Sequence, residues 1–133
     1  MKNKLFLAFI LILSLVTLSG CTSKENSSTS SYQKITAKEA KEMMDQTEDI
    51  IILDVRSEDE FNDGHIEHAL LIPDTEIEKN AESTIPDKTA TILVYCRSGR
   101  RSALASASLS KLGYTNVYDF GGIIDWDYDV VTS

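Results

Sequence analysis

The sequence has little positive charge and few residues that bind metals. Among its 133 residues, 13 Lys and Arg stand against 21 Asp and Glu, and the formal net charge is -8. Nucleic-acid binding needs a basic surface to meet the phosphates, so this balance excludes a nucleic-acid partner. The two histidines, His65 and His68, have no paired thiols beside them and fall short of the three or four ligands of a usual zinc site. We therefore expect no metal.

Cysteine is equally scarce, because Cys21 and Cys96 are the two in the chain. Their separation excludes a C-x-x-C redox mechanism within the chain. If Cys21 is modified, Cys96 has no partner for an internal disulfide and is either an inert buried residue or a reactive one. Internal repeats are also lacking, and the length leaves room for one domain of ordinary size.

One long apolar run stands at the start of the sequence. Two lysines precede residues 5–18, which are apolar except for one Ser and one Thr, as in the n-region and h-region of a secretory signal. The run ends in Leu-Ser-Gly-Cys21, which resembles the lipobox of bacterial lipoproteins and implies acylation of Cys21, with palmitate for example, and cleavage before it. An uncleaved anchor is the alternative, but the run is short against the roughly 20 residues of a spanning helix. We expect a signal peptide at 1–20 and an extracytoplasmic protein that is lipid-anchored to a bacterial membrane.

The next segment has the composition of a tether. Seven of the twelve residues from 22 to 33 are Ser or Thr, which is typical of a flexible linker. We therefore expect residues 21–33 to hold the lipidated cysteine and the tether, and residues 34–133 to form one monomeric domain.

Capping motifs and apolar periodicity predict alternating helices and strands in that domain. Capping boxes at Thr36 and Ser57 predict helices at 37–46 and from 57 to Gly64. Leu104, Ala105, Leu109 and Leu112 predict the buried side of a third helix, at 100–112. Apolar runs predict strands at 50–53, 70–72, 91–95 and 117–120, with one helical turn and loop within 74–88 and a last short helix at 123–126. This order indicates an open, mostly parallel α/β sheet with helices on both faces.

The loop after residue 95 concentrates the chemistry of the chain. Cys96 ends the strand, and the segment CRSGRRS leads into the helix at 100–112, a place where ligands bind in open α/β sheets. Successive amides at a helix N-terminus form an anion-binding nest, and Gly99 allows the tight turn. Three of the four arginines, Arg97, Arg100 and Arg101, lie within five positions of Cys96. These cations and the helix N-terminus favour the thiolate, so we expect a reactive Cys96 at the mouth of a pocket.

A structural alternative is a buried cysteine followed by surface arginines that stabilise the start of the helix. Cations at a helix N-terminus oppose its dipole, so this alternative predicts the wrong charge there.

Three groups of residues together resemble the single-domain rhodanese family. Residues 96–102 resemble its active-site loop. Its first signature is similar to Asp54-Val55-Arg56, Glu60-Phe61, Gly64-His65-Ile66, Ala69 and Ile72-Pro73. Its closing segment is similar to Val117-Tyr118, Gly121-Gly122 and Trp126. These pieces cover nearly all of residues 34–127 in the order of the family.

The resemblance implies a rhodanese-like fold and thiosulfate sulfurtransferase activity. Cys96 would attack the outer sulfur of thiosulfate or a related sulfane-sulfur donor, release sulfite, and pass the sulfur of its persulfide to cyanide or a thiol. Substrate binding would fall to the loop residues Arg97, Ser98, Gly99, Arg100, Arg101 and Ser102. No metal or organic cofactor is needed. We expect Asp54, Arg56, Glu60 and His65 to support the site structurally, and Trp126 to cover the core.

Two other functions remain open from the sequence. The domain could carry persulfide sulfur or bind a partner without turning over small molecules. It could also be a cysteine phosphatase. The active-site loops of that class are similar to the pattern C-x5-R, with an arginine six positions after the cysteine. Here the sixth position after Cys96 is Ser102 and the spacing is C-x4-R, a shorter loop that suits a compact sulfur better than a phosphate.

Overall fold

The computed structural model describes residues 31–133, and the expected signal peptide, Cys21 and tether residues up to 30 lie outside the described residues. A five-stranded sheet runs through the domain in the order β1-β5-β4-β2-β3, and every pairing in it is parallel. Its strands are β1 (Gln33–Lys34), β2 (Ile50–Asp54), β3 (Leu70–Leu71), β4 (Thr91–Cys96) and β5 (Asn116–Gly122).

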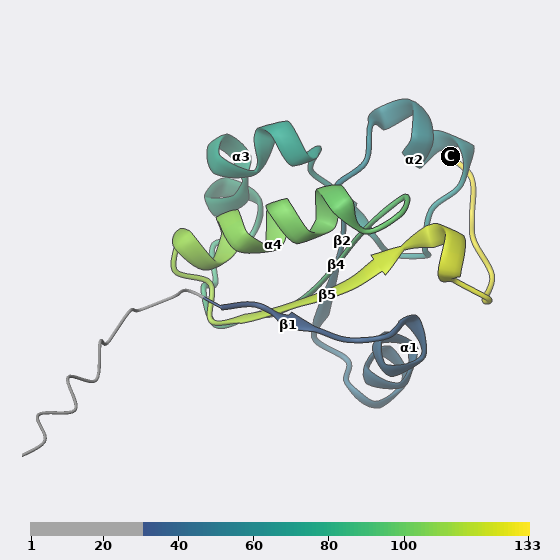
Figure 1. Ribbon diagram of the computed structural model, residues 1–133, viewed down its shortest axis with the longest axis horizontal. Coiled ribbons are helices and arrows are strands. Elements are labelled where there is room, and N and C mark those ends of the chain that lie inside the picture. Colours follow the sequence, from purple (N-terminus) through teal and green to yellow (C-terminus); the bar gives the residue numbers. More distant parts are fainter. Residues whose placement is uncertain (1–30) are drawn as a thin grey trace, which may run out of the picture.

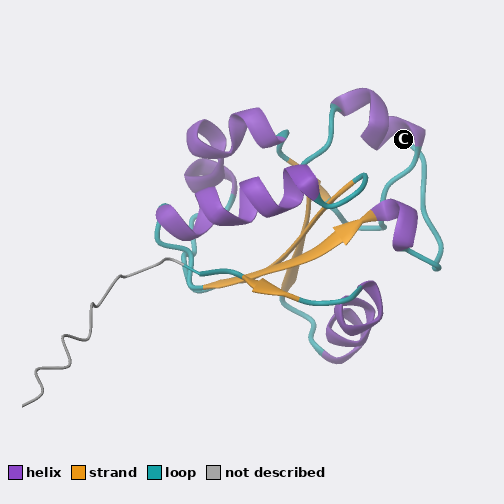
Figure 2. Ribbon diagram, in the orientation of Figure 1, coloured by secondary structure: helices purple, strands orange, loops and turns teal. Residues whose placement is uncertain are grey.

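Helices cover both faces of this sheet. They are α1 (Ala37–Gln46), α2 (Glu58–Asp63), α3 (Ile77–Thr84) and α4 (Arg100–Lys111), with 3-10 turns η1 (Asp74–Glu76) and η2 (Ile123–Asp125). In Figures 1 and 2, α3 and α4 lie above the sheet and α1 lies below it. The expected α/β class, with a parallel sheet between helices, is confirmed. The residues from 31 to 133 include no helix with the length and apolar character to cross a bilayer.

Both predicted capping boxes are present and set the starts of two helices. The Thr36 amide donates to Glu39 Oε2 at 2.7 Å, and the Ser57 amide donates to Glu60 Oε2 at 3.0 Å. The serine and threonine hydroxyls accept the reciprocal bonds, which satisfies amides that have no partner within the helix.

Two expectations for the helices are wrong. Residues 74–88 hold η1 and the eight-residue α3 rather than one turn, because Ile77, Ala81 and Ile85 recur every four residues and are buried. Leu104 is 57% exposed and lies outside the buried side of α4. It stands two positions after the fully buried Ser102, nearly opposite on the helix, and small residues such as Ser102 allow α4 to lie close to the sheet.

The first strand was not expected. Gln33 pairs with Tyr118 and Lys34 with Asp119, so the sheet begins one residue inside the segment expected to be tether. Two residues carry too little pattern to indicate a strand, and the pairing depends on β5 lying beside them.

The strands divide their side chains between two cores. Ile92, Val94 and Cys96 of β4 join the cluster beneath α3 and α4, whereas Leu93 and Tyr95 join the cluster with α1 and Trp126. This alternation follows from the two-residue period of a strand. It places Cys96 at the carboxyl end of the central strand, on the α4 side.

Candidate active site

The Cys96 loop turns back over the cysteine that precedes it. Cys96 is the last residue of β4, and Gly99 has a φ of 100°, a left-handed conformation that favours glycine. The turn aims the Gly99 amide at the sulfur, where it donates to Cys96 Sγ at 3.0 Å. The next residue, Arg100, begins α4. The expected order of strand, loop and helix N-terminus is therefore confirmed around Cys96.

Cys96 is more deeply placed than we expected. Only 1% of its surface is exposed, so it lies at the base of the loop rather than at the mouth of a pocket. Burial raises the pKa of the Cys96 thiol, but hydrogen bonds from the side chain and amide of Ser102 and the amides of Gly99 and Ser98 lower this pKa by more. The net effect is a pKa below the ordinary value for cysteine. The hydrogen bond from the Gly99 amide thus stabilises the thiolate directly.

The end of β5 passes very close to this loop. A Cβ atom added at Gly122 would lie 2.1 Å from the carbonyl oxygen of Arg97, far inside contact distance. The neighbouring Gly121 has a φ of 89°, and its carbonyl lies 3.3 Å from the Ser102 hydroxyl. The Arg97 carbonyl also accepts from the amide of Ile124 at 3.2 Å. The two glycines of the closing segment therefore allow the strand to support the loop.

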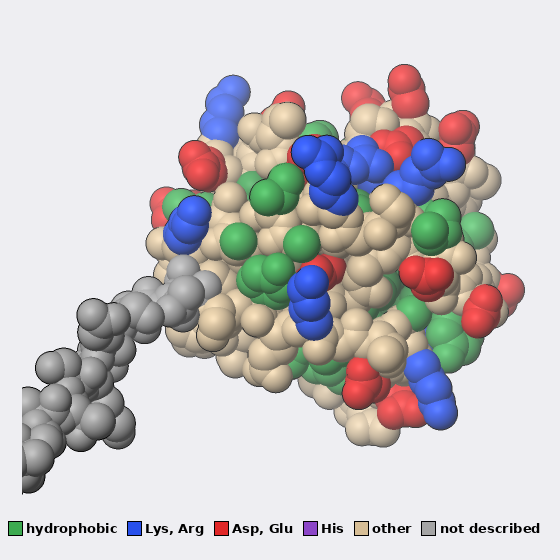
Figure 3. Space-filling view, viewed as in Figure 1, with side chains coloured by type: hydrophobic (Ala, Val, Ile, Leu, Met, Phe, Trp, Pro, Cys, Tyr) green, Lys and Arg blue, Asp and Glu red, His purple; other side chains and the backbone are tan. Residues whose placement is uncertain are grey.

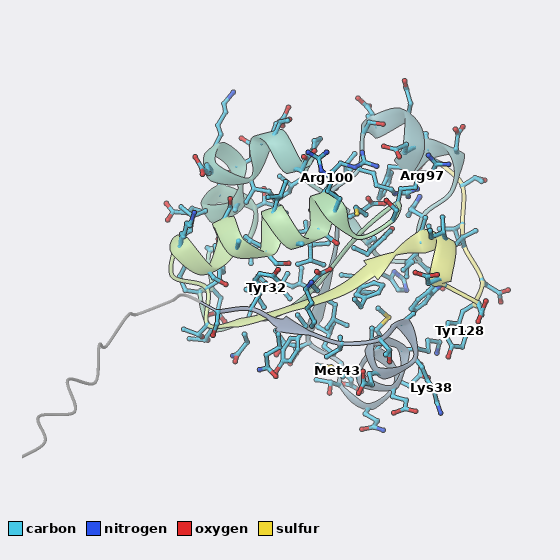
Figure 4. All side chains as sticks on the ribbon, in the orientation of Figure 1. Tyr32, Lys38, Met43, Arg97, Arg100 and Tyr128 are labelled. Carbon is cyan, nitrogen blue, oxygen red and sulfur yellow. The ribbon has the colours of Figure 1, made fainter. Side chains whose placement is uncertain are left out.

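The three arginines of the loop have different environments. Arg101 donates to both carboxylate oxygens of Glu60, at 2.7 and 2.8 Å. No carboxylate among the described residues forms an ion pair with Arg97 or Arg100. Figure 4 places both of these side chains near the N-terminal end of α4, where Figure 3 shows basic side chains gathered. Two guanidinium groups near the loop thus remain available to an anion.

The ion pair also changes the acidity of Glu60. The side-chain hydrogen bonds from Arg101 are the main cause that lowers the pKa of Glu60 to about 2, with further help from Ser57 and against a smaller effect of burial. Glu60 therefore closes the capping box of α2 and binds the first turn of α4 with the same carboxylate.

A second ion pair lies buried beside the carboxyl end of β2. Arg56 Nη2 donates to Asp54 Oδ2 at 2.7 Å and to the carbonyl of Gly64 at 2.7 Å. Burial lowers the pKa of Arg56, but the hydrogen bonds and charge of Asp54 raise it by more. Asp54 and Arg56 join β2 to the end of α2, and no bond connects them to Cys96.

His65 holds the C-terminal segment in place. Its backbone exchanges two hydrogen bonds of 2.8 Å with Val131, and its ring stacks on Phe61 while Nδ1 donates to the Phe61 carbonyl at 2.9 Å. His68 lies apart, with 85% of its side chain exposed. Trp126 is buried in the core, as expected.

Sequence reasoning missed Asp119, which is buried within β5. Its carboxylate accepts from the Gly121 amide at 3.0 Å and so supports the turn that faces the Cys96 loop. The available signal was a charged residue inside an apolar strand, because such a residue is rarely buried without a partner.

Comparisons with known proteins agree with this architecture. The family described as "Rhodanese-like domain" matches residues 36–128. Thiosulfate sulfurtransferase PspE of Escherichia coli is 38% identical over 73 residues, which are 55% of this chain and 70% of that protein. A sulfurtransferase of Allochromatium vinosum is 41% identical over 81 residues, which are 60% of this chain and 74% of that protein.

Solved structures show the same fold. A structure described as rhodanese with anions from E. coli superposes with a TM-score of 0.60 at 34% identity, covering 63% of this chain and 99% of the other. A rhodanese-like domain protein from Staphylococcus aureus gives a TM-score of 0.68 at 30% identity, covering 76% and 98%. With its parallel sheet, its cysteine loop and these relatives, the chain belongs to the rhodanese-like domain family, and the activity that its relatives support is sulfur transfer.

Proposed function

We propose that this protein transfers sulfane sulfur from thiosulfate to a thiophilic acceptor through a persulfide on Cys96. The observation that carries the proposal is the 3.0 Å hydrogen bond from the Gly99 amide to Cys96 Sγ, together with the lowered pKa of that thiol. A sulfur that accepts amide hydrogen bonds is stabilised as the thiolate, which is the nucleophilic form.

Each step conserves atoms and electrons. The Cys96 thiolate attacks the outer sulfur of thiosulfate, a new S–S bond forms, and the S–S bond of thiosulfate breaks with its electron pair leaving on sulfite. The resulting persulfide anion occupies the place of the thiolate beside the loop amides. Cyanide or a thiolate then attacks the outer sulfur, and the Cys96 thiolate leaves with the electron pair of the second S–S bond. Neither step needs a metal or an organic cofactor.

Charge near the loop supports an anionic donor. Arg97 and Arg100 have no carboxylate partner among the described residues, and they lie beside the loop whose Gly99 amide donates to Cys96. In a chain of net charge -8, this local positive potential concentrates a dianion such as thiosulfate. The E. coli relative whose structure is described with anions is consistent with this assignment. The deep placement of Cys96 favours a compact donor.

The same geometry weighs against a phosphatase. In the C-x5-R pattern the arginine stands six positions after the cysteine, whereas Arg101 stands five positions after Cys96 and is held by both oxygens of Glu60. Position 102, where that pattern has its arginine, is a serine in this chain. Its hydroxyl donates to the carbonyl oxygen of Gly99 at 3.1 Å and so belongs to the loop itself.

The test is thiocyanate formation from thiosulfate and cyanide by the purified chain. We expect turnover that is abolished in Cys96→Ala and retained in Cys21→Ala, which serves as the matched control. Intact mass after thiosulfate should show one added sulfur, which cyanide removes. An added sulfur without thiocyanate turnover would identify a carrier. Equal turnover in Cys96→Ala and the parent would overturn the proposal.

We also propose that the domain works outside the cytoplasm on a lipid anchor at Cys21. The support is the signal-like run and the lipobox-like tetrad of the sequence. Labelling of bacteria that express the chain with radioactive palmitate should mark the protein, and Cys21→Ala should lose the label while Cys96→Ala keeps it. Label retained in Cys21→Ala would exclude this anchor.

A further inference from the structure

A groove lies on the face of the sheet opposite Cys96. Its volume is about 680 Å³, and it runs between the C-terminal half of α1, the start of β2, residues 66–68 and the segment 126–129. In Figure 1 α1 covers this face, and the chain after β5 descends beside it. Ile50 and Ile52 of β2, which line the groove, are only partly buried. The apolar layer on this side of the sheet is therefore incomplete.

The floor of the groove is apolar and its rim is acidic. Met44, Ile66 and Trp126 extend the floor, and Tyr128, which is 40% exposed, forms part of one wall. The lining also contains five carboxylates on three different segments: Asp45, Glu48, Glu67, Asp127 and Asp129. Among residues 31–133, no Lys or Arg pairs with Glu48, Asp127 or Asp129. The groove thus joins apolar surface to uncompensated negative charge.

Lys41 indicates what kind of group this rim accepts. Its ammonium group pairs with Asp45 and lies 5.6 Å from the centre of the Tyr128 ring, within the range of a cation–π contact. Trp126 packs edge-on against Tyr128, with ring centres 4.8 Å apart, which steadies that ring. A cation with an apolar stem is therefore already part of the lining, whereas Glu48, Asp127 and Asp129 have no Lys or Arg partner among residues 31–133.

We propose that this groove binds a basic, amphipathic peptide segment of a partner protein. Apolar side chains of the segment would cover Ile50 and Ile52, and its Lys or Arg side chains would meet the free carboxylates. Because the carboxylates stand on three separate segments of the chain, several linked cations fit them better than one small cation. The groove and Cys96 belong to the two different cores, so a bound segment leaves the Cys96 loop open.

Trp126 makes the proposal directly measurable, because it is the one tryptophan of the chain. The full chain would be titrated with the hexapeptide (Leu-Lys)3, while the emission of Trp126 is followed. We expect a saturable shift that weakens as NaCl is raised, because salt screens the carboxylates. The peptide (Leu-Glu)3 tests the need for positive charge, and (Ser-Lys)3 tests the need for apolar side chains. Neither should saturate in the concentration range in which (Leu-Lys)3 does.

Matched variants separate this groove from general attraction to an acidic protein. Asp127→Asn/Asp129→Asn should weaken (Leu-Lys)3 binding about tenfold, as expected for losing two solvent-exposed ion pairs. Glu58→Gln/Glu78→Gln removes the same charge from α2 and α3 and should leave binding unchanged. Thiocyanate formation should be unaffected by the bound peptide, so failure of the sulfurtransferase assay does not bear on this result.

Three outcomes would overturn the proposal. Equal weakening in both double variants would show non-specific attraction. Equal affinity for free lysine amide would identify a small-cation site. Concentration-dependent self-association that Asp127→Asn/Asp129→Asn abolishes would identify a second copy of this chain as the occupant.

Discussion

Glu60 and Arg101, which stand 41 positions apart, are joined by two hydrogen bonds of 2.7 and 2.8 Å. The pair connects the first turn of α2 to the first turn of α4, beside the Cys96 loop. It also separates the roles of the loop arginines, because Arg101 is bound to a carboxylate whereas Arg97 and Arg100 have no such partner among the described residues.

Glu60→Gln should lower stability in a way that depends on pH. The pKa of Glu60 is lowered to about 2, so its stabilising charge is fully present above about pH 4.5 and is lost as pH falls towards 2. We expect Glu60→Gln to cost about 0.5–1 kcal/mol at pH 7, the value for a largely solvated ion pair, and almost nothing near pH 2. Urea unfolding of the parent and the variant at several pH values measures the loss of stability at pH 7 and near pH 2. Glu39→Gln, at the same capping position in α1 but without an ion pair, is the control and should cost less at pH 7. An equal cost at pH 2 and 7 would contradict this account.

Alkylation should report the lowered pKa of Cys96. The rate of reaction with iodoacetamide rises with the thiolate fraction, so its midpoint marks the pKa. Peptide mapping should give a midpoint for Cys96 below the roughly 8.5 of an ordinary cysteine, and below that of the same residue in urea. Ser102→Ala should move the midpoint upward, because hydrogen bonding from the Ser102 side chain lowers this pKa. A folded midpoint equal to the unfolded one would show that the loop does not stabilise the thiolate.

Gly122→Ala should disrupt the loop while Gly64→Ala should not. The added methyl group at 122 meets the Arg97 carbonyl at 2.1 Å, whereas at 64 it meets a methyl of Val130 at an ordinary 3.7 Å. Overpacking of this kind costs about 1–3 kcal/mol or displaces the backbone. The temperature of thermal unfolding and the rate of thiocyanate formation should both be lower in Gly122→Ala and unchanged in Gly64→Ala. Parent-like behaviour of Gly122→Ala would mean that the loop and β5 can separate freely.

Arg56→Met should be among the most destabilising single changes in the domain. It leaves the fully buried Asp54 without its cation, a loss of about 3–5 kcal/mol. The double variant Asp54→Leu/Arg56→Met removes the stranded charge and should recover much of this loss. Chemical unfolding of the parent, the two single variants Asp54→Leu and Arg56→Met, and the double variant measures the coupling. If the double variant is as unstable as the sum of both single variants, the pair is not coupled as described.

Arg97→Ala and Arg100→Ala should each raise the KM for thiosulfate several-fold, because each removes positive potential beside the Cys96 loop. Lys111→Ala, at the far end of α4, is the control and should leave KM unchanged. The ionic-strength dependence of kcat/KM should be shallower in the loop variants than in the parent. An unchanged KM in both loop variants would place donor binding elsewhere.

The parts of the fold predicted from sequence depend on neighbours along the chain. The capping boxes of α1 and α2 join residues three apart, and the apolar runs of β2 and β4 show their burial within five or six residues. The order of strand, cysteine, glycine and helix could therefore be predicted around Cys96. The burial of α3 has only a weak local pattern, because its three apolar residues are spread among polar ones.

The tertiary structure decided what depends on distant segments. The near-complete burial of Cys96, the binding of Arg101 by Glu60 and the close approach of Gly122 to Arg97 join parts of the chain that no local pattern brings together. The sequence alone determined that a cysteine and three arginines share one loop, because covalent neighbours cannot separate. Which of those arginines stays free for an anion depended on where α2 packs, and packing of distant elements is set by the whole core rather than by any one segment.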